Sequence, residues 1–143
     1  MARPLSVTFH RAFDMSRDPI ESLDNLVALG VDRVLTSGQG ASVIEGLPVV
    51  SQLVRRADTR IAVMAGGGLT EQNVKAVVSA TGVRELHFTG RTGIESRMTY
   101  RNLLVSMGSV VRPAEYSRLV TDSERVRSMR EEAEAALNSE VIL

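Results

Sequence analysis

The chain contains no cysteine and no tryptophan, and only 3% of its 143 residues are aromatic. The missing cysteine excludes disulfides, a cysteine nucleophile, zinc ribbons and iron–sulfur clusters. The 17 basic and 17 acidic residues cancel, so no overall field draws the chain toward nucleic acid or anionic lipid. Few aromatic residues also leave little for stacking RNA bases. We therefore expect no nucleic-acid partner and no membrane partner.

Long hydrophobic runs are missing as well. No apolar segment approaches the roughly 20 residues that span a bilayer, and the N-terminus has no signal-peptide pattern. The 43% hydrophobic content argues against disorder, and the length is typical of one domain with its own core. We expect a single cytoplasmic globular domain over residues 1–143. Nucleotide-binding loop motifs and the H-E-x-x-H motif are missing too, so no organic cofactor is evident.

What the sequence does have is a repeated alternation of strand and helix patterns. Short runs of strand type lie at residues 7–10, 33–36, 60–64 and 85–88, and helical apolar stripes follow the first three. This alternation predicts βα units and a parallel sheet, which is an α/β fold. A charged helix is expected over residues 121–138, with most of its Arg and Glu side chains in solvent.

The predicted helices have recognisable ends. Asp18 is expected to cap the first helix, with Pro19 in its first turn and Gly30 after its end. Thr70 is expected to begin the third helix and Gly82 to end it. Two architectures fit the pattern: a small doubly wound open sheet, or the last four units of an eight-stranded (β/α)8 barrel of the TIM-barrel type plus a C-terminal helix.

Polar or glycine-rich residues follow every predicted strand, where parallel α/β folds place their sites. Gly66-Gly67-Gly68 directly precedes the predicted helix start, so its amides are candidates for binding phosphate or carboxylate. A purely structural glycine turn is the alternative. The candidate residues at these ends are His10, Arg11, Asp14, Thr36, Ser37, Gly66, Gly67, Gly68, Gly90 and Arg91.

Two histidines fall on the strand face opposite the apolar side chains. Alternation places His10 and His87 toward the interior of a barrel, near its mouth. Imidazoles there can act as acid–base groups or bind a metal ion. The alternative is a structural histidine hydrogen-bonded to a neighbour such as Glu85. The methionines are scattered and are expected to be mostly core filler, so local spacing indicates no strong metal site.

Two motifs, Thr8–Asp14 (TFHRAFD) and Leu35–Gln39 (LTSGQ), closely resemble the second half of the CutC copper homeostasis protein family. The agreement continues through further blocks as far as about Met129: Met64–Gly68, Glu85–His87, Met98–Asn102 and Glu115–Ser117. The resemblance implies a (β/α)8 barrel, a cytoplasmic location, assembly into oligomers and a role in copper tolerance or trafficking.

The resemblance also implies that a complete family member is nearly twice this length. The first four βα units, with the cysteines proposed to bind copper in the family, have no counterpart in these 143 residues. We interpret the chain as a truncated reading frame or gene fragment. It would pair with itself as a homo-oligomer or with a missing N-terminal half.

Two functions remain open from the sequence. The first is copper homeostasis with copper binding, as the family resemblance implies. The alternative is an enzyme or sensor acting on a small anionic metabolite. In that case Arg11 would neutralise the ligand's charge and His10 or His87 would transfer protons, with Asp14 as a further candidate.

Overall fold

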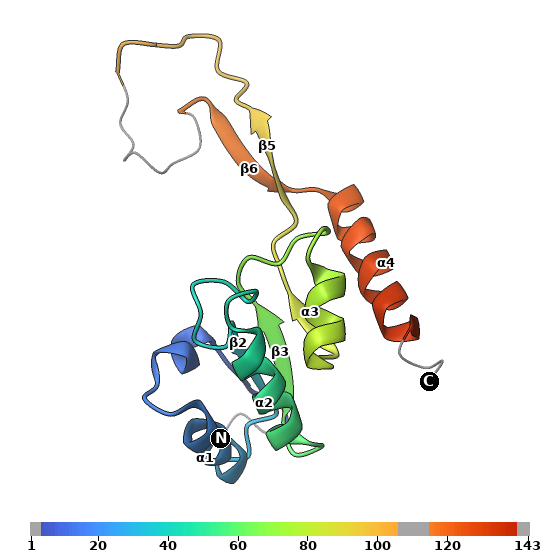
Figure 1. Ribbon diagram of the computed structural model, residues 1–143. Helices are drawn as coiled ribbons and strands as arrows, with labels where there is room; N and C mark the ends of the chain where they lie inside the picture. The colour runs from blue at the N-terminus through green and yellow to red at the C-terminus, as the bar shows by residue number, and fades with distance from the viewer. Residues whose placement is uncertain (1–3, 106–114, 140–143) are drawn as a thin grey trace. The chain divides into compact units, whose positions relative to one another are not determined.

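The computed structural model describes residues 4–105 and 115–139 (Figure 1). The chain divides into two compact units, Met1–Phe88 with Ser128–Leu143 and, between them in the sequence, Thr89–Arg127. The expectation of a single domain over residues 1–143 stays a prediction. Within the described residues, no helix is both long and apolar enough to cross a membrane.

The first unit is built on a parallel sheet. Every strand pairs with the next one along the chain, in the order β1-β2-β3-β4, as the alternating pattern predicts. Strand β2 (Arg33–Thr36) confirms the predicted run 33–36. Strands β1 (Thr8–Phe9) and β4 (Glu85–His87) are shorter than predicted, and β3 (Ala62–Gly66) lies two residues later than predicted. Because all run in one direction, their carboxyl ends meet at one edge of the sheet.

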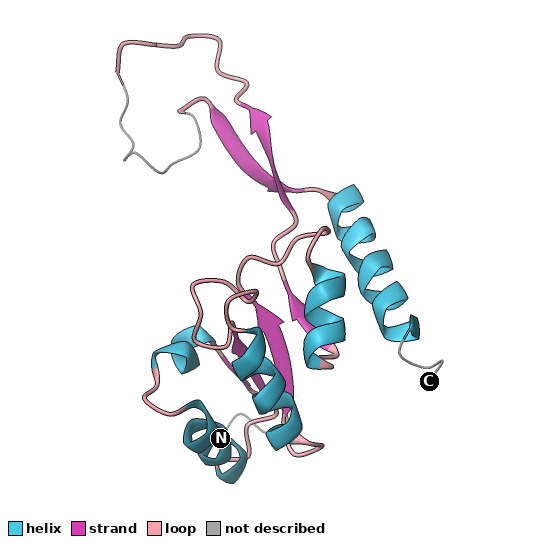
Figure 2. Ribbon diagram, in the orientation of Figure 1, coloured by secondary structure: helices cyan, strands magenta, loops and turns pink. Residues whose placement is uncertain are grey.

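Helical segments connect these strands, shown in cyan in Figure 2. A 3₁₀ helix, η1 (Arg11–Met15), precedes α1 (Pro19–Ala28) between the first two strands. The next two connections carry α2 (Leu47–Ala57) and α3 (Val74–Thr81). The alternation of the sequence therefore corresponds to successive βα units.

The core lies between the helices and one face of the sheet. Val34, Val63 and Ala65 point to this face and are buried with Leu23 of α1 and other apolar helix residues. Leu86 and Phe88 pack against the same cluster, as the alternation in residues 85–88 predicts. Burial of these side chains contributes the main favourable term in folding.

The opposite face of the sheet carries an ion pair beside apolar side chains such as Leu35 and Met64. Arg33 Nη2 donates to Glu85 Oε1 at 2.9 Å, and Arg33 Nε donates to Glu85 Oε2, across the intervening strand β3. The hydrogen bonds from Arg33 hold the pKa of Glu85 below its usual range, against the effect of burial. Glu85 is therefore engaged by Arg33, and the expectation that it bonds a histidine is wrong.

The first helix ends where the sequence predicts. Asp18 Oδ1 accepts from the backbone N–H groups of Ile20 and Glu21 at 2.8 and 3.0 Å. At the other end Gly30 adopts a φ of +72°, and its N–H donates to the carbonyl oxygen of Val27 at 3.0 Å. Both ends are set by residues local in sequence, which explains why they are readable from it.

The third helix begins four residues later than Thr70. Residues 71–73 form a turn, and α3 starts at Val74. Asn73 stabilises this turn: its Oδ1 accepts from Thr70 N at 2.9 Å and its Nδ2 donates to the Gly68 carbonyl at 2.9 Å. The prediction that the triple glycine leads directly into a helix N-terminus is therefore wrong.

The second unit contains an antiparallel strand pair that the sequence analysis missed. Strand β5 (Arg91–Glu95) pairs with β6 (Ser117–Thr121), shown in magenta in Figure 2. The last helix, α4 (Ser123–Ser139), matches the predicted 121–138 segment closely. Its Met129, Ala133 and Ala136 are buried in the core of the first unit.

Candidate functional site

The loop after β1 carries the first functional side chains. His10 lies just before η1, and its Nδ1 accepts from the backbone N–H of Ala12 at 3.0 Å. Phe13 is buried and anchors the segment in the core. The short helix therefore holds Arg11 and Asp14 at the carboxyl end of the sheet.

Asp14 joins this loop to the loop after β2. Its Oδ1 accepts from Thr36 Oγ1 at 2.5 Å and from the N–H of Ser37 at 3.1 Å. Its Oδ2 accepts from Arg11 Nε at 2.7 Å and from Ser37 Oγ at 3.1 Å. Thr36 and Ser37 are fully buried, and the Asp14 side chain is 8% exposed. Such a fully bonded buried carboxylate fixes the relative position of the two loops.

The hydrogen bonds decide the charge of Asp14. Burial raises the pKa of Asp14, but bonds from Thr36, Arg11 and the N–H groups of Ser37 and Gln39 together outweigh burial. The pKa of Asp14 is consequently below its usual range. At neutral pH Asp14 is an anion that positions Arg11, which does not suit it to the role of general acid.

Hydrogen bonds fix part of the Arg11 guanidinium and leave the rest of it accessible. Its Nη2 donates to Ser37 Oγ at 2.6 Å, and that hydroxyl also lies 2.8 Å from the carbonyl oxygen of Gly40. The Arg11 side chain is 43% exposed, and Nη1 has no hydrogen-bond partner within residues 4–105 and 115–139. A guanidinium with its Nε and Nη2 sides fixed and Nη1 free is suited to bind an oxyanion.

Gly67 brings the loop after β3 against this guanidinium. Gly67 has a φ of +101°, and a Cβ built on it would lie 3.1 Å from Arg11 Nη1 and 3.1 Å from Ser37 Cβ. The Gly67 carbonyl accepts from Val43 N at 2.8 Å, which fixes the turn in place. Glycine at this position therefore allows the backbone to approach Arg11 closely.

The two histidines lie at opposite ends of the strand order. Both are exposed, and the His10 ring stacks on Phe9 with centroids 5.6 Å apart. His87 ends β4 and pairs in register with Gly66. Three interstrand steps separate β1 from β4, roughly 14 Å at the usual strand spacing. His10 therefore adjoins Arg11, whereas His87 lies at the far edge of the same sheet.

The remaining predicted residues are divided between the two units. Gly66 ends β3 beside His87, and a Cβ on it would lie 2.8 Å from Leu35 Cδ1. Gly90 and Arg91 belong to the second unit, where Gly90 O accepts from Asp122 N and Arg91 O accepts from Arg125 Nη1. The expectation that they complete a glycine cradle stays a prediction.

The methionines do not form a buried set. Met129 is buried and Met64 is half-buried, but Met15 and Met98 are 88% and 58% exposed. The expectation that most are core filler is therefore wrong for two of these four, while Met1 and Met107 lie outside the described residues. Across the part of the chain that is described, no three His, Asp or Glu side chains cluster as metal ligands would.

One residue of this site escaped the sequence analysis. Gln39 donates from Nε2 to the carbonyl oxygen of Ser16 at 2.6 Å, and its N–H donates to Asp14 Oδ1 at 3.3 Å. Its φ of +61° is unusual for a residue other than glycine. Two signals in the sequence pointed to it: its place in the Leu35–Gln39 motif and its position between Gly38 and Gly40.

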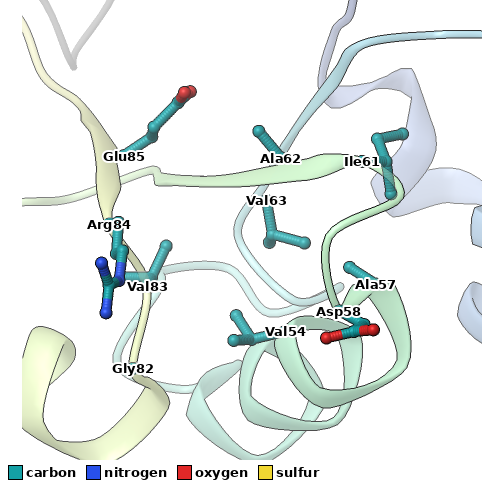
Figure 3. Close-up of a pocket in the computed structure, with 10 residues that line it drawn as sticks. All are labelled: Val54, Ala57, Asp58, Ile61, Ala62, Val63, Gly82, Val83, Arg84 and Glu85. Atoms are coloured by element: carbon teal, nitrogen blue, oxygen red, sulfur yellow. The ribbon is translucent and has the colours of Figure 1, made fainter.

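A cavity of about 240 Å³ lies at the other end of the strands (Figure 3). Its walls are mainly apolar and come from the C-terminal end of α2, the start of β3 and the segment leading into β4. Asp58 and Arg84 supply charge there. The cavity contains none of the candidate residues, and the amino ends of parallel strands are where such folds keep stabilising residues.

The strand-end residues lie in the part of the chain that is similar to known proteins. A sequence model of the CutC family matches residues 1–92, which include β1 to β4 and all the residues around Arg11. The chain belongs to the CutC family. The mouse copper homeostasis protein cutC homolog is 46% identical over 129 residues, covering 90% of this chain and 47% of that protein. A CutC family protein of Parabacteroides distasonis is 46% identical over 127 residues, covering 89% of this chain and 52% of that protein.

The CutC relationship extends to a solved structure. A crystal structure named for the copper homeostasis protein CutC of Streptococcus agalactiae aligns with a TM-score of 0.56 and 38% sequence identity. The alignment covers 59% of this chain and 42% of that one. The chain spans about half the length of the curated CutC relatives it matches.

Proposed function

We propose that this CutC-family chain serves in copper homeostasis and that its strand-end site binds a small ligand carrying an oxyanion. The copper part rests on the names of the relatives. The ligand part rests on one observation, which is that Asp14 and Ser37 fix the Arg11 guanidinium with Nη1 left open beside Gly67.

For copper, the donors on this chain favour weak binding. Copper(I) prefers thiolate and thioether ligands, and the chain has no cysteine. The exposed thioethers of Met15 and Met98 and the exposed imidazoles of His10 and His87 are the remaining candidate donors named above. We expect a competition titration against a copper(I) chelator to give an affinity weaker than nanomolar. A stoichiometric site of sub-nanomolar affinity would contradict this.

For the anionic ligand, the site offers charge, hydrogen bonds and a neighbouring imidazole. Arg11 supplies a planar guanidinium cation, whose fork of N–H donors matches an oxyanion. His10 uses Nδ1 to accept the Ala12 N–H, so its neutral ring carries the proton on Nε2. That nitrogen is the group available for proton transfer if the chain is an enzyme, and His87 is the second candidate.

We extend the proposal to the whole fold. The four βα units would form the second half of a (β/α)8 barrel, with a second copy or four further units covering the open edges at β1 and β4. Parallel sheets are generally covered on both faces. In a closed barrel, the face that carries Arg33 and Glu85 would be covered as well. A cytoplasmic location is part of this proposal and follows from the family resemblance.

The test of ligand binding is a calorimetric titration of the full chain with sulfate, phosphate and acetate. We expect saturable binding that Arg11→Gln weakens by at least about tenfold, the effect of losing a charge-assisted bond. Arg84→Gln is the matched control, because Arg84 lies at the amino end of the strands. Equal affinity in the two variants would refute a site at Arg11.

A further inference from the structure

Gln39 holds an unusual backbone conformation directly beside the candidate site. Its φ of +61° follows the +71° of Gly38, so two successive residues lie in the left-handed region. Among the other described residues that are not glycine, only Asp58 also has a positive φ. Such conformations persist where the surroundings determine them, and they concentrate at functional sites.

The contacts of Gln39 explain what determines its conformation. Its side-chain amide donates to the carbonyl oxygen of Ser16 at 2.6 Å, directly after η1 ends. Its backbone N–H donates to Asp14 Oδ1 at 3.3 Å, within η1 itself. One residue of the β2 loop therefore bonds both the interior and the end of the segment that carries Arg11.

The segment is thus anchored at both of its ends. His10 caps the start through the Ala12 N–H, and Gln39 secures the end through Ser16. Between these anchors Arg11 reaches Asp14 and Ser37. Displacement of the Ser16 end would move Asp14 and, with it, the Arg11 guanidinium relative to Gly67.

We propose that Gln39 is a positioning residue that sets where Arg11 presents its free nitrogen to an anionic ligand. The inference rests on the proposed function of the site, and it assigns Gln39 no contact with the ligand. Preorganised donors bind more tightly because ordering them costs nothing at the moment of binding.

Gln39→Gly separates positioning from stability. Glycine adopts a positive φ without strain, which offsets the loss of the side-chain bond to Ser16, so the variant should unfold at about the same denaturant midpoint. Its sulfate affinity should nevertheless fall by about tenfold because Arg11 is no longer held. Gln52→Ala, on the exposed side of α2, is the control and should leave the affinity unchanged.

Gln39→Glu adds a second measurement, the pH dependence of sulfate affinity, which a purely structural role of Gln39 would leave unchanged. A carboxylate cannot donate to the Ser16 carbonyl, but a protonated carboxyl group can. Sulfate affinity relative to the unaltered protein should be low at neutral pH and recover as pH falls below about 4.3, the ordinary pKa of the introduced carboxyl. Unaltered affinity in Gln39→Gly, or a flat ratio in Gln39→Glu, would overturn the proposal.

The Arg11 Nε–H signal in a nitrogen-15 spectrum distinguishes this inference from the proposed function. Without any ligand, that signal should shift or broaden in Gln39→Gly and stay in place in Gln52→Ala. If the signal shifts but the unaltered protein binds no sulfate, the proposed function fails while the positioning of Arg11 by Gln39 stands. If the signal does not move, Gln39 does not position Arg11.

Discussion

At the scale of single residues, the close approach of Gly67 to Arg11 gives a direct prediction. Gly67→Ala should weaken sulfate binding, because its Cβ would lie 3.1 Å from Arg11 Nη1 on a backbone with a φ of +101°. It should also destabilise the fold by about 1 kcal/mol or more, since alanine disfavours positive φ. Gly93→Ala, which meets nothing within 4 Å, is the control. Sulfate affinity equal in both variants would count against the arrangement of Gly67 and Arg11.

The charge of Asp14 predicts how stability depends on pH. Its pKa is lower in the folded chain, so its contribution is present above the ordinary value of about 3.9 and disappears as pH falls through the folded pKa. Asp14→Asn should therefore flatten the loss of unfolding free energy between roughly pH 5 and pH 2. Thr36→Val, which removes one donor, should flatten it less. Denaturant unfolding across this range is the measurement, and an unchanged slope in Asp14→Asn would contradict the account.

At the scale of elements, α1 tests how far local signals determine the fold. Asp18→Ala removes the acceptor for two backbone N–H groups and should lower the unfolding free energy by about 1 kcal/mol. Asp18→Asn keeps a capping oxygen and should change it by only a few tenths of a kcal/mol. Chemical denaturation of both variants measures the difference. Equal loss in the two would show that the cap does not stabilise α1.

The sequence predicts elements well where local contacts decide them. The ends of α1 depend on Asp18 and Gly30, which act within a few residues. The start of α3 does not follow the same pattern, because the Asn73 side chain stabilises a turn from Thr70 instead of leaving Thr70 to cap a helix. The β5–β6 pair joins residues more than twenty positions apart in the chain, which local sequence patterns do not specify.

The candidate site also has features that the sequence predicts and contacts that it does not predict. The parallel order of strands brings Arg11, Asp14 and Ser37 to one edge, which follows from the alternation alone. The details do not follow from it: Ser37 contacts Arg11 through a hydroxyl, and Gln39 reaches back to Ser16. Those contacts depend on the path of the β2 loop through two positive φ values, which sequence pattern does not specify.

At the scale of the whole molecule, the open strands β1 and β4 predict association. Each has a neighbour on one side only within the described sheet, and exposed edges promote pairing with another chain. The isolated chain should scatter light as more than a monomer at micromolar concentration, and its unfolding midpoint should rise with concentration. A monodisperse monomer with a midpoint independent of concentration would show that the open sheet is stable alone.

The central claim is that an oxyanion binds between Arg11 and the Gly67 turn, and one titration tests it most directly. Sulfate is added to the nitrogen-15-labelled full chain while the Arg11 Nε–H and the backbone N–H signals of Gly67 and Gly68 are followed. The account predicts saturable shifts that share one dissociation constant at these groups and disappear in Arg11→Gln. Signals that stay in place there, or that drift linearly like those of exposed residues elsewhere, would contradict it.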